Sequence, residues 1–101
     1  MKVILSPRIR IGASTCRIKN VPHLSNDDGL RGYHNRRNGE IGIESTLEGE
    51  RRDRTLLHEI VHQIDDSYGV GLSDENVDRI GNGIYEFLEN LHIELDWGKI
   101  K

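Results

Sequence analysis

Cysteine, proline and aromatic residues are scarce in this sequence of 101 residues. The single Cys16 excludes an internal disulfide framework and a zinc finger built from several cysteines. No apolar run approaches the roughly 18 residues that a membrane-spanning helix needs, and residues 3–5 are too few for the apolar core of a signal peptide. With 35% hydrophobic and 5% aromatic residues, the chain can build one small core. We therefore expect a single domain over residues 1–101, without a membrane span, in the reducing cytoplasm.

Charge of one sign is not in large excess either. The 14 Lys and Arg residues stand against 17 Asp and Glu residues, which gives a formal net charge of −3. Nucleic-acid binding usually needs a net basic face, so this balance disfavours nucleic acid as a partner. A local group of cations consists of Arg36, Arg37, Arg51, Arg52 and Arg54. Acidic residues are interspersed with it and no aromatic residues are available for base stacking, which is typical of a mixed, solvated surface.

The N-terminal half has the patterns of β-strands. Apolar and polar residues alternate over 8–11 and over 16–19, with Gly12 between them as a turn. Composition predicts a loop over 25–29. Asn38-Gly39 favours a type I′ turn, which would join a strand through Tyr33 to a strand over 40–44.

Two helices are expected in the C-terminal half. Residues 53–67 contain neither Gly nor Pro, and their apolar residues recur at helical spacing until Gly69, which suits the left-handed position after a helix. Ser73 is a good N-cap for a second helix that reaches about residue 92. The predicted fold class is α+β: a small antiparallel or mixed sheet of three to four strands, then two helices packed on one side of it.

The first predicted helix contains His58-Glu59-Ile60-Val61-His62, a His-Glu-x-x-His motif. Residues four apart share one helical face, so the two imidazoles can converge on a single zinc ion. Glu59 points to a different side of the helix, from which it can reach a zinc-bound water as general base without taking a ligand position. The competing interpretation is a surface helix whose two histidines merely face solvent.

A catalytic zinc site usually has three protein ligands, so two histidines leave one position open. No histidine follows at a suitable spacing, and we therefore expect a carboxylate. Asp78 is the preferred candidate, because Asn82 lies one turn later as a hydrogen-bond partner in its second shell. Gly81 and Gly83 would let the second helix approach the first closely. Glu75, one turn before Asp78, is an alternative third ligand.

This arrangement resembles the gluzincin class of zinc metallopeptidases, in which the next helix supplies an acidic ligand. Residues 55–88 are similar to short phage-type metallopeptidases, to the minigluzincins and to the catalytic domain of ImmA/IrrE proteins. The resemblance implies a zincin-like fold and Zn²⁺ as cofactor, with His58, His62 and Asp78 as ligands and Glu59 as base. Asp78 departs from the glutamate usual in the family and is one methylene shorter, so either the helices pack closer or Glu75 binds instead.

The resemblance also implies an edge strand beside the active-site helix that pairs with an extended substrate. The strand over 40–44 fits this role, with Ile41, Gly42 and Ile43 as substrate-binding residues, although an ordinary sheet strand is an equal alternative. Tyr85 or Tyr68 is the candidate donor to the oxyanion of the transition state.

We therefore expect a zinc-dependent peptidase that hydrolyses peptide bonds through a metal-activated water. The alternative is a zinc-stabilised regulatory or latent module without proteolytic activity, because small domains often depend on a structural metal. In a latent protein the tail around Trp97 would lie across the cleft. The expected partners are a protein or peptide substrate and a partner protein that completes the cleft. Nucleic-acid binding through the arginines is the third hypothesis.

Overall fold

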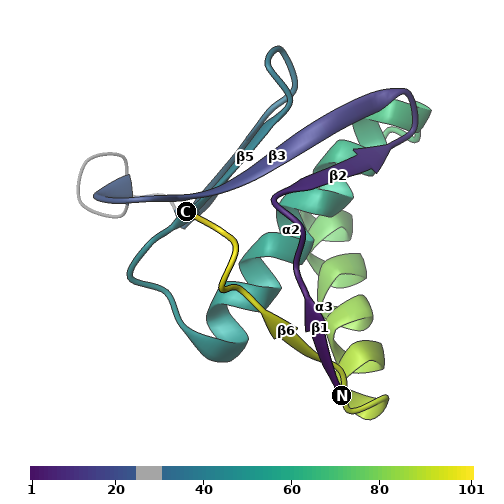
Figure 1. Cartoon of the computed structure of the whole chain (residues 1–101). Helices are drawn as coiled ribbons and strands as arrows, with labels where there is room; N and C mark the ends of the chain where they lie inside the picture. Colours follow the sequence, from purple (N-terminus) through teal and green to yellow (C-terminus); the bar gives the residue numbers. More distant parts are fainter. Residues whose placement is uncertain (25–30) are drawn as a thin grey trace.

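The computed structural model describes residues 1–24 and 31–101, and within them the chain has an α+β fold (Figure 1). The elements are β1 (Lys2–Ile4), β2 (Arg8–Ile11), β3 (Ser14–Val21), β4 (Gly32–Asn35), β5 (Glu40–Glu44), α2 (Gly49–Tyr68), α3 (Asp74–Asn90) and β6 (Glu94–Asp96). The predicted fold class is confirmed, with a sheet in the N-terminal half followed by two helices. The loop predicted over 25–29 lies outside the described residues.

The main sheet has the strand order β2-β3-β5-β4. β2 and β3 form the predicted antiparallel hairpin through Gly12, whose φ is 63°. β3 pairs with β5 in parallel and β5 pairs with β4 antiparallel, so the sheet is mixed.

The β4–β5 hairpin joins the expected strands through a longer connection than predicted. Asn35 pairs with Glu40, which leaves residues 36–39 as the connection. Only Gly39 among these has a positive φ (66°), so the predicted type I′ turn at Asn38-Gly39 is wrong. The Gly39 carbonyl also accepts a hydrogen bond from the Arg17 N–H at 2.7 Å, so the end of this four-residue connection is tied to β3.

The two ends of the described chain form a second, two-stranded sheet. β1 pairs with β6 in parallel, and Figure 1 shows these strands side by side below the main sheet. Beyond β6, Trp97 is buried in the core, and its Nε1 donates to Asp53 Oδ1 at 2.7 Å. The expectation that the tail around Trp97 lies across the cleft is therefore wrong, because this indole belongs to the core.

α2 is the central element of the fold. It packs on β4 and β5 with one side and on α3 with the other. It begins at Gly49, four residues before the predicted start, and ends as predicted at Gly69 (φ 62°, ψ 41°). Ser73 caps α3 as predicted, because its hydroxyl accepts a hydrogen bond from the Asn76 N–H at 3.2 Å.

The main core lies between the sheet, α2 and the C-terminal tail. Its buried members are Cys16, Ile18, Ile41, Ile43, Leu47, Leu56, Trp97 and Ile100. Burial raises the pKa of the Cys16 thiol and removes it from any exposed site. Within residues 1–24 and 31–101, neither helix combines the length and the apolarity needed to cross a membrane.

Candidate metal centre

His58 and His62 lie one turn apart on a single face of α2, as their spacing predicts. Their rings meet edge to face, with centroids 4.8 Å apart and an interplanar angle of 76°. The His58 side chain is 31% exposed, so the pair sits at the margin of the helix packing rather than fully in solvent. The two imidazoles are thus close enough to act on one ligand.

α3 brings a carboxylate to this pair. Asp78 Oδ1 lies 3.7 Å from His58 Nδ1, and Asn82 Nδ2 donates to Asp78 Oδ2 at 3.4 Å. The two helices are close at Gly81, where a built Cβ would lie 3.4 Å from both Cα and N of His58, in ordinary van der Waals contact. A Cβ at Gly83 would meet nothing within 4 Å, so the prediction that Gly83 also serves close packing is wrong.

Other carboxylates near the two helices have partners elsewhere. Glu75, the alternative third ligand, pairs with Arg79 of its own helix and its side chain is 70% exposed. Asp65 accepts hydrogen bonds from the Gly71 and Leu72 N–H groups and so fixes the connection between α2 and α3. These contacts favour Asp78 over Glu75 as the third donor.

The electrostatics of His62 reveal two further acidic neighbours. Burial and the charge of His58 lower the pKa of the His62 imidazole, while Asp74 and Asp66 act in the opposite direction. Asp74 opens α3 one turn before Asp78, so two carboxylates of α3 act on the two histidines of α2.

Glu59 is buried next to the histidines. Glu59 is 7% exposed. Its carboxylate has neither a hydrogen bond nor an ion pair in the described part of the chain. Burial raises the pKa of Glu59 to about 7. A buried acid without a partner costs stability, and groups of this kind gather at functional sites.

The donors are gathered but do not yet surround a common point. No group of three or more His, Cys, Asp or Glu side chains in residues 1–24 and 31–101 stands in an arrangement that could hold a metal ion. Asp78 faces His58 directly instead. The donor set nevertheless fits zinc in kind, since two imidazoles and one carboxylate are common ligands of catalytic zinc. The Asp78 side chain is 66% exposed, so it is not fixed by burial and is free to rotate about its own bonds.

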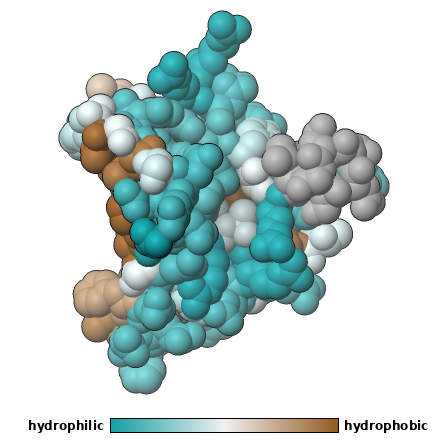
Figure 2. Space-filling model, turned by 180° about the vertical axis from the view of Figure 1, so that it is seen from behind, coloured by the Kyte–Doolittle hydropathy of each residue, from teal (hydrophilic) through white to brown (hydrophobic). Residues whose placement is uncertain are grey.

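A cleft of about 550 Å³ opens beside His58, Glu59 and Asp78, whereas His62 is not among the residues that line it. Its walls come from α2, α3 and the start of β4, and consist of Arg31, Gly32, Arg51, Arg54, Thr55, His58, Glu59, Asp78 and Asn82. Figure 2 views the molecule from the α3 side, where hydrophilic side chains cover most of the surface and apolar ones gather along one margin. The cleft is therefore polar: its basic wall contains Arg51 and Arg54 of α2 together with Glu59, and its acidic wall contains Asp78 of α3.

The arginines of the sequence cluster are divided among three places. Arg51 and Arg54 line the cleft, Arg52 stacks on an indole ring, and Arg36 and Arg37 lie between β4 and β5. They do not form one basic face. Sequence analysis assigned them all to solvated surface and missed the cleft arginines; the available signal was that Arg54 lies one helical turn before the first histidine of the motif.

Arg54 connects α2 to the acidic wall. Its Nη1 donates to Asn82 Oδ1 at 2.7 Å and its Nε donates to Glu50 Oε1 at 2.8 Å. With its oxygen so occupied, the Asn82 amide turns its nitrogen to Asp78. A series of polar contacts thus runs from the start of α2 to Asp78 and on to His58.

β5 is not the edge strand that the substrate prediction requires. It pairs with β3 on one side and with β4 on the other, so the backbone of Ile41, Gly42 and Ile43 is already occupied. The ring of Tyr33 covers Gly42 as well, because a Cβ built there would lie 2.2 Å from Tyr33 Cε2. The prediction that these three residues pair with substrate is therefore wrong. Among the described strands, β4 ends the sheet on the α2 side, and its first residue, Gly32, lines the cleft.

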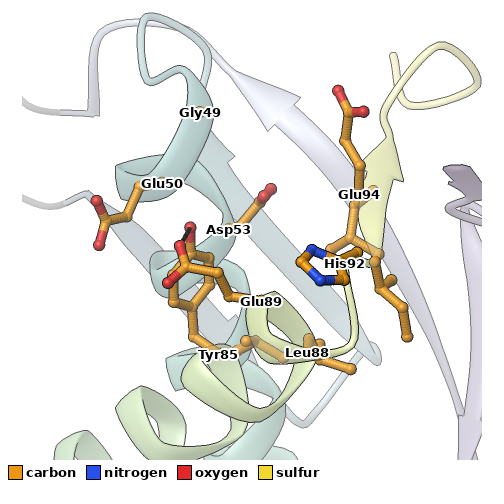
Figure 3. A pocket seen from close by; sticks show the side chains of 11 residues that line it. Gly49, Glu50, Asp53, Tyr85, Leu88, Glu89, His92 and Glu94 are labelled. Carbon is orange, nitrogen blue, oxygen red and sulfur yellow. Dashed lines mark hydrogen bonds between the residues drawn. The ribbon is translucent and has the colours of Figure 1, made fainter. Parts of the chain in front are cut away.

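The two candidate tyrosines lie outside the cleft. Tyr85 lines a second pocket of about 420 Å³ near the C-terminal end of α3, where its hydroxyl donates to Glu89 Oε2 at 3.3 Å (Figure 3). Tyr68 is the last residue of α2 and is 67% exposed. Neither is placed to stabilise a transition state beside His58.

Comparison with protein family models, with curated proteins and with solved structures finds no match for this chain. The functional interpretation therefore depends on the site itself.

Proposed function

We propose that this chain is a zinc-dependent peptidase of the cytoplasm that acts on a protein or peptide substrate. The observation that carries the proposal is the buried Glu59 carboxylate, which has no partner among the described residues and lines the same cleft as His58 and Asp78. A purely structural zinc site has no use for an unpaired buried acid. A hydrolytic site needs one as its base.

The proposed chemistry divides the work among residues of two helices. His58, His62 and Asp78 would hold the zinc ion, which when bound supplies Lewis acidity that makes water acidic near neutral pH and polarises a carbonyl. Glu59 would take the proton of the attacking water on its carboxylate and pass it to the departing amine. Asn82, whose Nδ2 donates to Asp78 Oδ2 at 3.4 Å, would orient the Asp78 carboxylate as a ligand.

Substrate binding is proposed along β4 in place of β5. An extended peptide can add to a free strand edge through backbone hydrogen bonds. β4 packs tightly on α2: a Cβ at Gly32 would lie 2.9 Å from Thr55 Cγ2, one turn before His58. This contact would hold a strand-added peptide next to the motif.

His34 anchors the same strand to α2. Its Nε2 lies 2.6 Å from Gln63 Oε1 and its Nδ1 lies 3.4 Å from Asp66 Oδ2. Because Gln63 follows His62 directly, these contacts tie the proposed substrate strand to the turn that carries the second histidine.

The test compares zinc-loaded wild type with the Glu59→Gln variant on a library of internally quenched peptides. We expect the wild type to cleave, and Glu59→Gln to keep its zinc while cleavage falls by at least about a hundredfold. Glu86→Gln, on an exposed position of α3, is the matched control and should cleave like wild type. Equal cleavage by Glu59→Gln and wild type would contradict the proposal. Zinc binding that raises thermal stability without any cleavage would favour the non-proteolytic module instead.

A further inference from the structure

The basic wall of the cleft carries more charge than the described residues neutralise. Arg31 flanks β4, Arg51 lies in the first turn of α2, and both line the cleft with Arg54. The carboxylates that line the cleft are Glu59, on the same helix as Arg51 and Arg54, and Asp78 on α3. Glu50 pairs with Arg54, so the positive charge without a partner among the described residues is that of Arg31 and Arg51.

The three cleft arginines differ in their hydrogen bonds and ion pairs. Arg54 is engaged by Glu50 and by Asn82 and stacks on the Tyr85 ring at 4.3 Å. The guanidinium groups of Arg31 and Arg51 have no ion pair or hydrogen bond within residues 1–24 and 31–101. Both residues are exposed, so both side chains are available to an incoming ligand.

We propose that Arg31 and Arg51 select substrates with a carboxylate close to the cleaved bond, a selection that rests on the proposed peptidase function. Guanidinium groups bind carboxylates with two parallel hydrogen bonds, and two guanidinium groups without partners repel a lysine or arginine side chain at the same place. The carboxylate belongs either to an Asp or Glu side chain or to the C-terminus of a peptide. Both sources present the same anionic group to the arginines.

The expected selectivity is modest. Ion pairs between exposed groups are weakened by water and salt, so each arginine should contribute a factor of roughly two to five in affinity, and the pair up to about tenfold. The preference should also shrink when salt is raised from about 0.1 M to about 1 M, which shortens the screening length from about 10 Å to about 3 Å.

The experiment uses fluorescence anisotropy to measure how tightly labelled peptides bind to the full-length Glu59→Gln variant. This variant is used so that the peptides are bound without being cleaved. Peptides with both ends capped carry Glu, Gln or Lys at one position, moved residue by residue along a neutral sequence. A neutral peptide with a free C-terminus, compared with its amide, tests the second source of the carboxylate. Arg31→Gln and Arg51→Gln are made singly and together, with Arg37→Gln from the β4–β5 connection as control.

We expect the peptides with a carboxylate to bind best, at one or two positions of the sequence. This preference should disappear in the double Arg variant, persist in Arg37→Gln, and turn towards Lys in Arg51→Glu. Equal affinity for Glu, Gln and Lys peptides at every position, or a preference that survives the double variant, would overturn the inference. Cleavage of neutral peptides by the wild type in that case would leave the proposed peptidase function standing, whereas carboxylate binding without any cleavage would leave the selection and remove the function.

Discussion

Replacing Glu59 with Gln should stabilise the metal-free protein near neutral pH. The Glu59 carboxyl is almost fully buried, and burial raises its pKa from the ordinary value of 4.5 to about 7. Below about pH 4.5 it is protonated in both the folded and the unfolded chain. Between these two pKa values the folded protein binds more protons than the unfolded one, so the free energy of unfolding falls as pH rises. At about 1.36 kcal/mol for each pKa unit, the loss amounts to roughly 3 kcal/mol. Gln cannot ionise, so the Glu59→Gln variant does not lose this free energy of unfolding as pH rises.

The assay is urea unfolding followed by circular dichroism, with a chelator present, at several pH values from about 4 to about 8. The lowered pKa of His62 makes the free energy of unfolding rise with pH, which is the opposite effect, but this contribution is common to both proteins. The difference between wild type and Glu59→Gln therefore isolates the Glu59 carboxyl, and Glu86→Gln should follow wild type throughout. The same pH dependence in wild type and Glu59→Gln would refute the inference that this acid is buried without a partner.

Two further predictions concern the scaffold around the site. Gly42→Ala should lower the free energy of unfolding by about 1–3 kcal/mol in urea melts, because the new Cβ would displace the Tyr33 ring and break its hydrogen bond to Glu40; an unchanged urea midpoint would contradict this packing. Trp97→Phe keeps an aromatic ring but removes the donor to Asp53, so it should cost about 1–3 kcal/mol and raise the Asp53 pKa further, as measured by NMR titration of the carboxyl; an Asp53 pKa equal to that of wild type would show that the hydrogen bond has no weight.

Local signals along the chain predicted the helices and the histidine pair. The ends of a helix depend on nearby residues, so Gly69 and Ser73 could be assigned as caps from sequence alone. The spacing of His58 and His62 likewise fixes their shared face through the helical repeat. The α2 start was placed too late, because its first turn is polar and carries no apolar periodicity.

Pairing between distant segments could not be predicted in the same way. An Asn-Gly pair indicates a hairpin but does not reveal that β3 will add to the far side of β5, and this addition decides which strand forms the edge beside α2. The pairing of β6 with β1 joins residues more than ninety positions apart and has no local signature. The third donor lies between these cases. The pairing of Glu75 with Arg79 is a local contact four residues apart on one helix, but only the fold shows that Asp78 faces His58.

Isothermal titration of the metal-free chain with zinc tests the central claim most directly. The account predicts one tight site per chain, lost in His58→Ala and in His62→Ala and weakened in Asp78→Asn, with Glu75→Gln binding like wild type. A chain that takes up no zinc, or that binds it equally well without either imidazole, would contradict the account.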